Sequence, residues 1–177
     1  MRNARPPKKP PPPLNDARLR GLALHYVGKY ATTRSKLATY LTRKIRERGW
    51  DGELSADLEA LVEQFAGLGY VNDAQFAEAR SRSFVARGYG KRRLDEDLRH
   101  SGIAEDDAAE AVGHMTDSKF AAAANFARRK RIGPFAGEAA PPEKRQKQLQ
   151  GFLRAGHDFG LARRFVEAEP GEELTEE

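Results

Sequence analysis

The chain contains no cysteine, and no apolar run approaches the roughly 20 residues that a membrane-spanning helix needs. The first absence excludes a disulfide framework, a thiolate metal site and a cysteine nucleophile, and it fits a reducing compartment. The second excludes a membrane span, and the first 14 residues also lack the apolar core of a signal peptide. These absences predict a soluble, cytoplasmic protein with no membrane partner.

Residue patterns typical of cofactor or metal chemistry are also missing. The four histidines (His25, His100, His114 and His157) show no metal-ligand spacing, and no glycine-rich loop with a lysine is present to hold a nucleotide phosphate. Two acidic triplets, 95–97 and 105–107, could suggest a two-metal nuclease, but consecutive helical residues point about 100° apart. We therefore expect no metal, no cofactor and no enzyme activity.

Charge is unevenly distributed along the chain. The formal net charge is +5, from 31 basic and 26 acidic residues. Residues 1–13 carry four bases and no acid, and residues 167–177 carry six acids and no base. The remaining body has 27 basic and 20 acidic residues, an excess of +7. A basic body favours a polyanion or an acidic protein surface as partner.

Helical periodicity dominates from Asp16 onward, because apolar residues recur at spacings of three and four without strand-like alternation. The pattern predicts an all-α fold of nine helices. Capping residues predict that the first four helices start at Asn15 or Asp16, after Thr32 or Thr33, near Ser55, and at Asn72 or Asp73. The last three helices are expected over Phe120–Lys130, Glu143–Ala155 and Phe159–Val166.

An internal repeat groups these helices in threes. Ile45, Leu98 and Phe152 each stand four residues before a helix-ending glycine. The repeat predicts a tandem array of three three-helix modules, elongated and curved, since about 50 residues offer too little apolar surface for an independent core. The expected domains are a disordered basic proline-rich tail over 1–13, modules over 14–69, 70–115 and 116–168, and an acidic disordered tail over 169–177.

The middle of the chain resembles a known family. Residues 69–77 read GYVNDAQFA, followed by Gly88-Tyr89-Gly90 and by a pattern RLxxDLxxxGI over 93–103. This combination resembles the central module of the RecX family, and a weaker resemblance extends from about Leu19 to Val166. One departure is that Ala155-Gly156-His157 stands where the family's third module usually has Arg-Gly-aromatic.

The resemblance implies function as well as fold. It implies three-helix modules that bind the RecA recombinase, modulate or inhibit its filament on single-stranded DNA, and lower its ATPase, strand-exchange and coprotease activities in recombination and DNA repair. No catalysis is implied. The expected partner is the RecA filament, the expected state is a monomer, and direct contact with single-stranded DNA is left open.

Basic residues are the candidate contacts, and helical phase sorts them. Lys36, Arg43 and Arg46 face away from the apolar stripe of their helix, whereas Lys44 and Arg48 lie near it. Lys91, Arg92 and Arg93 follow the Gly88-Tyr89-Gly90 elbow, which we expect to be flexible, and they begin a helix. Cations at a helix start disfavour folding, although Glu96 can pair with Arg92. The predicted partner-binding residues are Lys36, Arg43, Arg46, Arg80, Arg87, Tyr89, Lys91, Arg92 and Arg93.

Other interpretations of the basic residues remain open. Arg80 and Arg87 share a helix side with Phe76 and Phe84, so they are either edge residues that snorkel or contacts in a cleft between modules. Arg128–Arg131 end a helix, where cations favour the dipole, and they receive lower weight. Two rival functions are a helical DNA-binding transcription regulator of the helix-turn-helix kind and a scaffold for other helices.

Overall fold

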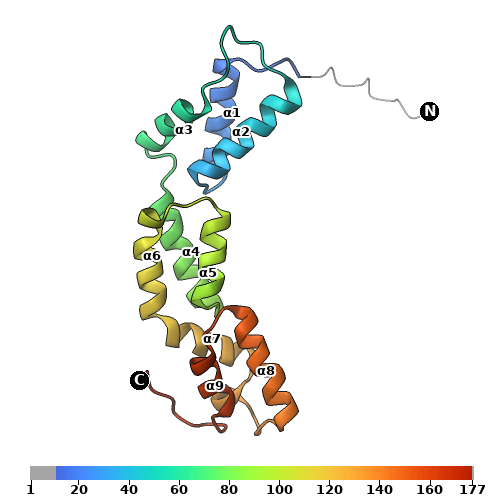
Figure 1. Ribbon diagram of the computed structural model, residues 1–177, viewed down its shortest axis with the longest axis vertical. Coiled ribbons are helices and arrows are strands. Elements are labelled where there is room, and N and C mark those ends of the chain that lie inside the picture. The colour runs from blue at the N-terminus through green and yellow to red at the C-terminus, as the bar shows by residue number, and fades with distance from the viewer. Residues whose placement is uncertain (1–10, 177) are drawn as a thin grey trace, which may run out of the picture. The chain divides into compact units, whose positions relative to one another are not determined.

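A computed structural model describes residues 11–176 (Figure 1). Within that range the chain forms nine α-helices, one short 3-10 turn and no β-strand, so the predicted all-α fold is confirmed. The chain divides into two compact units, one ending at Asn72 and one beginning at Asp73. Residues 1–10, which make up most of the predicted basic tail, lie outside the described residues.

The first unit contains α1 (Asp16–Lys29), α2 (Arg34–Arg48) and α3 (Leu58–Gly67). Side-chain oxygens of Asn15, Thr33 and Asp57 accept hydrogen bonds from backbone N–H groups three residues on, at 3.0, 3.2 and 2.9 Å. Asn15 and Thr33 are each one of the two candidates that the sequence offers for these caps. The third helix begins later than the expected start near Ser55, because Asp57 is its cap and not part of its first turn.

One apolar cluster holds the first unit together. Its buried members are Leu14, Leu19, Ala23, Leu37, Leu41, Val62, Phe65 and Val71. The segment before α1 is also fixed, since Leu14 exchanges backbone hydrogen bonds with Gly49 and Asp51 at 2.9 and 2.7 Å. The Pro12 carbonyl accepts from both Nε and Nη2 of Arg48, at 3.1 and 2.7 Å. The end of the stretch expected to be disordered is thus held against α2.

The second unit contains α4 (Asp73–Arg87), α5 (Lys91–His100), α6 (Glu105–Asp117), α7 (Lys119–Lys130), α8 (Pro142–Ala155) and α9 (Phe159–Glu167). A 3-10 turn over Gly133–Phe135, which the sequence does not predict, joins α7 to the loop before α8. Helices α4–α6 enclose one apolar cluster and α7–α9 another. The unit is therefore two three-helix modules in succession.

The helix-ending glycines of the repeat have a positive φ in all three modules. Gly49, Gly102 and Gly156 follow α2, α5 and α8 with φ of 79°, 70° and 94°. A left-handed residue at this position closes the last helical turn, and glycine adopts it without a Cβ penalty. After α5 and α8 the same turn recurs, because the N–H groups of Ile103 and His157 donate to the carbonyls of Leu98 and Phe152, each at 3.2 Å. After α2 the turn differs, since Gly49 has a ψ of 165° and its N–H donates to the Ile45 carbonyl.

The C-terminal segment after α9 differs from the expected disordered tail. Its Gly171 N–H donates to the Pro134 carbonyl at 3.0 Å, and the Glu169 carboxylate pairs with Arg145 at 3.1 Å. Leu174 packs against the apolar cluster of α7–α9. The acidic composition favours disorder, but one leucine, one backbone hydrogen bond and one ion pair attach the segment to the module.

Candidate partner-binding surface

Tyr89 lies between α4 and α5 and is surrounded by arginines. The guanidinium carbons of Arg87, Arg93 and Arg129 lie 5.2, 5.6 and 5.7 Å from the centre of its ring. These arginines come from the end of α4, the start of α5 and the end of α7. We call these four residues the Tyr89 cluster. Cations placed over an aromatic ring are held by its quadrupole, at about 0.5–1 kcal/mol each when exposed.

The three guanidinium groups of the Tyr89 cluster lack acidic partners. Among residues 11–176 none of them forms an ion pair with a carboxylate, and all three side chains are exposed. Like charges gathered on one ring repel one another, and an anionic ligand relieves that repulsion. The cluster is therefore suited to bind carboxylates or phosphates, which guanidinium groups can grip in a bidentate manner.

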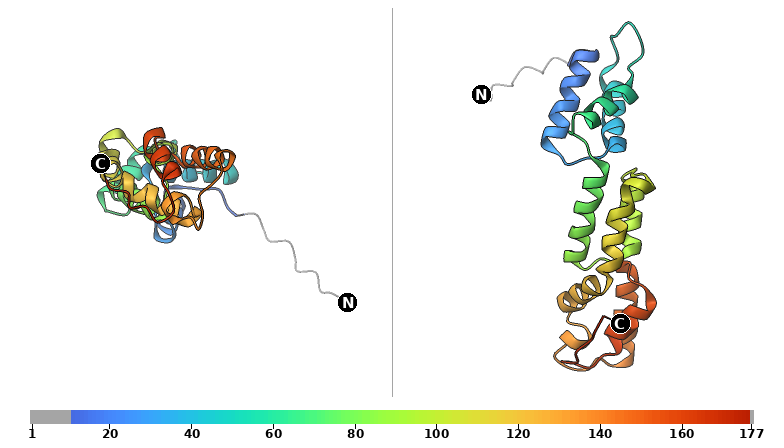
Figure 2. Two further views of the ribbon diagram at one scale, coloured as in Figure 1. Left: turned by 90° about the horizontal axis from the view of Figure 1, so that it is seen from below. Right: turned by 90° about the vertical axis from the view of Figure 1, so that its left-hand side faces the viewer.

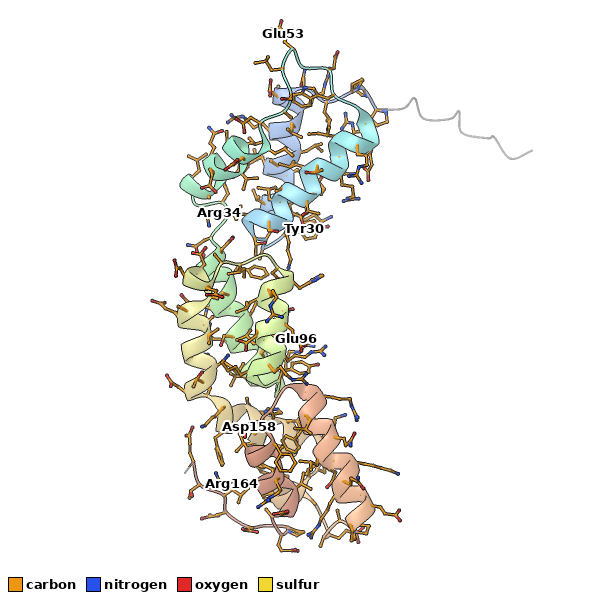
Figure 3. All side chains as sticks on the ribbon, in the orientation of Figure 1. Tyr30, Arg34, Glu53, Glu96, Asp158 and Arg164 are labelled. Atoms are coloured by element: carbon orange, nitrogen blue, oxygen red, sulfur yellow. The ribbon has the colours of Figure 1, made fainter. Side chains whose placement is uncertain are left out.

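The groove lined by Arg87, Tyr89 and Arg93 of the cluster also contains an arginine of a different kind, Arg80. Arg80 donates from Nε and Nη2 to the two carboxylate oxygens of Asp97, at 2.8 and 2.6 Å. This hydrogen bonding raises the pKa of Arg80, and its guanidinium also lies 5.0 Å from the Phe84 ring centre. Glu96, labelled in Figure 3, lines the same groove. Arg80 thus joins α4 to α5, which makes it a structural residue at the edge of the site.

The Tyr89 cluster stands on the seam between the two modules of the second unit. The Gly90 N–H donates to the Ala155 carbonyl at 2.9 Å, and the Arg92 N–H donates to the Gly156 carbonyl at 3.2 Å. Gly90 and Gly156 are both buried. A Cβ on Gly90 would lie 2.4 Å from the Gly156 backbone, so only glycine permits this approach. The elbow expected to be flexible is instead closely packed.

His157 completes the seam from the third module. Its ring packs against Phe126 and Phe152, with centres 5.6 and 5.3 Å away. Its Nε2 lies 3.1 Å from the Gly88 carbonyl oxygen, which can only accept, so Nε2 carries the proton. Burial lowers the pKa of His157, opposed by this hydrogen bond and by Asp158. His157 stands where the family's third module usually has an aromatic residue, and its imidazole ring likewise packs against aromatic side chains.

Lys91 and Arg92, two further predicted contacts, are already engaged. Lys91 Nζ pairs with Asp95 at 2.7 Å, and Arg92 pairs with Glu96 at 3.4 Å. The Arg92 guanidinium also donates to the Leu153 carbonyl across the seam. The pairing of Arg92 with Glu96 agrees with the rival interpretation that ordinary helix-surface ion pairs absorb this charge. Both residues contribute to the structure of α5 and its seam.

The predicted contacts on α2 lie in the first unit. Arg43 and Arg46 are exposed, as helical phase predicts, whereas Lys36 is half-buried in the first turn. Arg43 pairs with Glu47 at 3.1 Å, and Lys44 pairs with the same carboxylate at 2.6 Å. These contacts lower the pKa of Glu47, with the Lys44 hydrogen bond as the largest cause. Glu47 thus offsets one positive charge on this face, which it shares between Arg43 and Lys44.

Arg129 is the residue of the Tyr89 cluster that the sequence does not select. It belongs to the basic end of α7, where the dipole alone explains cations. Its neighbour Arg128 stacks on Phe135 at 4.7 Å and donates to Asn125 at 3.0 Å. Asn125 in turn donates to the Val85 carbonyl at 3.0 Å, which helps hold α7 against the end of α4. That packing brings Arg129 to Tyr89.

Between residues 11 and 176 no group of three or more histidine, cysteine or acidic side chains is arranged to hold a metal ion. No helix in this part of the chain is long and apolar enough to cross a membrane.

The fold and surface define a class: a helical-repeat protein with an arginine-rich surface between modules. A family model described as the second three-helix domain of RecX matches residues 72–112. The regulatory protein RecX of Myxococcus xanthus is 33% identical over 174 residues, covering 94% of this chain and 92% of that protein. The regulatory protein RecX of Thermobifida fusca is 34% identical over 155 residues, covering 86% and 79%. The chain belongs to the RecX family.

Solved structures agree with this assignment at the level of fold. The crystal structure of RecX from Lactobacillus salivarius superimposes with a TM-score of 0.60 at 17% identity, covering 85% of this chain and 94% of that one. Another crystal structure of a regulatory protein RecX gives a TM-score of 0.59 at 20% identity, covering 84% and 71%. The helical-repeat architecture is therefore shared.

Proposed function

We propose that this chain regulates a RecA-type recombinase by binding its filament on single-stranded DNA, lowering its ATPase, strand-exchange and coprotease activities. Membership of a family whose curated relatives are named regulatory proteins supports a regulatory role. The observation that carries the proposed binding is the Tyr89 cluster, whose three guanidinium groups face solvent without acidic partners among the described residues.

The rigidity of the seam explains why these arginines are suited to recognition. Long charged side chains lose rotamer entropy on binding, at about 0.5–1.5 kcal/mol each. Stacking on Tyr89 restricts the three guanidinium groups before a partner arrives. The glycine contacts fix Tyr89 itself between two modules. Less entropy is then lost when an acidic surface or a phosphate docks.

A repetitive partner also suits a protein of repeated modules. The α2 face, defined by Lys36, Arg43 and Arg46, supplies a second set of basic residues in the first unit. A filament presents the same surface at regular intervals, so two modest contacts on one chain act together once the first has formed. We propose that binding of this kind, and not catalysis, is the basis of regulation.

The test is an ATPase titration of a recombinase filament on single-stranded DNA. We expect substoichiometric amounts of this protein to lower the rate and the protein to co-sediment with the filament. An unchanged rate together with no co-sedimentation would contradict the proposal.

DNA binding without recombinase tests the rival DNA-binding regulator. Phosphate contacts weaken steeply as salt rises, since each one releases condensed counterions. Affinity for single-stranded and duplex DNA is therefore measured at 50 and 200 mM salt in the absence of recombinase. Tight duplex binding with sequence preference would favour the rival function, whereas weak binding without preference agrees with recognition of the filament.

A further inference from the structure

The acidic C-terminal segment folds back onto α9. Figures 1 and 2 show it returning alongside this helix after the chain has turned beyond Glu167. The Arg164 Nη2 group donates to the Thr175 carbonyl at 2.8 Å, and Leu174 is half-buried against the apolar cluster of α7–α9. Leu174 and the hydrogen bond from Arg164 thus hold the segment 172–176 on α9.

The segment lies at a groove between the start of α7 and the start of α9. Phe120 and Leu161 supply its apolar surface, Lys119 and Arg164 supply positive charge, and Asp158 and the segment's own Glu176 complete the lining. We call Lys119, Phe120, Leu161 and Arg164 the α7–α9 groove. Figure 3 labels Asp158 and Arg164 near the two ends of α9. An apolar floor flanked by cations fits a peptide that has one apolar residue between carboxylates.

The tail has that composition. Leu174 lies between Glu172, Glu173 and Glu176, and residues 167–177 contain no base. The tail is nevertheless loosely held, since neither Glu173 nor Glu176 forms an ion pair within residues 11–176. An exposed segment after the last helix, with one half-buried leucine, can leave the groove at a lower cost in free energy than a packed helix can leave the core.

We propose that the α7–α9 groove is a docking site for an acidic segment of a partner protein with a single apolar anchor, and that residues 172–176 occupy it in cis. The tail thereby acts as a built-in competitor. This inference goes beyond the proposed function, because it requires neither recombinase nor DNA. It places the site in the third module, separate from the Tyr89 cluster.

Intramolecular competition sets the size of the expected effect. A short flexible connection holds a tail at an effective concentration in the millimolar range. If the tail binds the open groove with a dissociation constant of about 0.1 mM, a competing peptide binds about tenfold more weakly to the intact chain than to one with an empty groove.

The test uses a fluorescein-labelled peptide with the sequence of residues 169–177 and measures its anisotropy with three proteins. These are the full chain, a variant ending at Pro170, and full-length Leu174→Ser, which keeps every acid. The last variant preserves the test should truncation impair folding, and thermal melts establish folding in each case. Full-length Glu173→Gln is the matched control, because Glu173 is exposed and makes no ion pair.

We expect the truncated and Leu174→Ser proteins to bind the peptide about tenfold more tightly than the full chain and Glu173→Gln. A peptide with the leucine replaced by serine should not bind. Lys119→Glu in the truncated chain should weaken binding, whereas Lys144→Glu on α8 should not. Equal affinity of the full and truncated chains, or no binding by any folded variant, would overturn the proposal.

Discussion

The two basic surfaces of this protein are built in different ways. On the α2 face the cations come from one helix, and Glu47 pairs with both Arg43 and Lys44 one turn away. In the Tyr89 cluster the cations come from three helices and share an aromatic ring, with no carboxylate partner among the described residues. One carboxylate on α2 therefore pairs with two of its cations, whereas the arginines of the Tyr89 cluster have no such pair among the described residues and are available to a partner.

The difference shows that exposure alone does not identify a binding residue. Arg43 and Arg93 are both exposed and both next to a tyrosine, with guanidinium carbons 5.6 Å from the ring centre in each case. Arg43 forms an ion pair with Glu47, whereas Arg93 forms none among the described residues, since Glu96 and Asp97 pair with Arg92 and Arg80. An exposed ion pair contributes about 0–1 kcal/mol to stability, but a partner must still break or bypass it. We therefore expect the Tyr89 cluster to carry more binding free energy than α2.

The largest expected effect comes from breaking the seam that positions the cluster. Gly90→Ala places a Cβ 2.4 Å from the Gly156 backbone, and backbone atoms cannot move aside without separating the modules. We expect the second unit to lose about 3 kcal/mol of stability, while the first unit is unaffected. Urea denaturation, followed by tyrosine fluorescence and circular dichroism, should show a destabilised transition.

Gly113→Ala is the matched control for that substitution. Gly113 lies in α6 with nothing within 4 Å of an added Cβ. Alanine should therefore stabilise the helix by about 0.5–1 kcal/mol. Equal effects of the two substitutions would show that the seam glycine is not needed for close approach.

A smaller effect is expected from the ion pair at the edge of the cluster. Arg80→Gln removes the bidentate contact with Asp97 that joins α4 to α5. Both side chains are about one-third exposed, so solvent screening limits the loss to about 1 kcal/mol. Arg82→Gln on the same helix breaks only an exposed pair with Glu78, at a cost of at most about 0.3 kcal/mol. Denaturation midpoints of both variants check this difference.

His157 makes the stability of the seam depend on pH. Burial lowers its pKa below the usual 6.5, so the unfolded chain binds a proton that the folded chain does not. The free energy of unfolding that the neutral, buried His157 ring contributes is complete above pH 6.5, and it is lost as the pH falls through the lower pKa of the folded chain. Urea denaturation at pH 7.5 and 5.5 should show a larger loss for the natural chain than for His157→Gln.

Local features could be predicted from the sequence. Caps at Asn15 and Thr33 depend on the hydrogen bond of one side chain to the next turn, so the helix starts follow from a few neighbouring residues. The left-handed glycines that end α2, α5 and α8 likewise follow from a short repeated pattern. The 3-10 turn at Gly133–Phe135 has no apolar periodicity to reveal it.

The candidate site could be predicted only in part, because its geometry depends on contacts between distant residues. Arg87, Tyr89 and Arg93 are close in sequence and are among the predicted contacts, but Arg129 reaches the same ring only through packing of α7 on α4. Helical phase places Arg80 beside Phe84 without revealing Asp97, 17 residues away. The glycines of the elbow suggest flexibility, whereas the backbone of the third module fills the space that they leave.

The most direct test of the difference between the two surfaces compares their charge-reversal variants in binding to a recombinase filament on single-stranded DNA. Co-sedimentation measures the affinity of Arg87→Glu/Arg93→Glu/Arg129→Glu and of Arg43→Glu/Arg46→Glu, with folding verified by thermal melts. We predict that the triple variant binds about 100-fold more weakly than the natural chain, and the α2 variant less than about tenfold more weakly. Natural affinity in a folded triple variant, combined with a large loss in the α2 variant, would contradict the account.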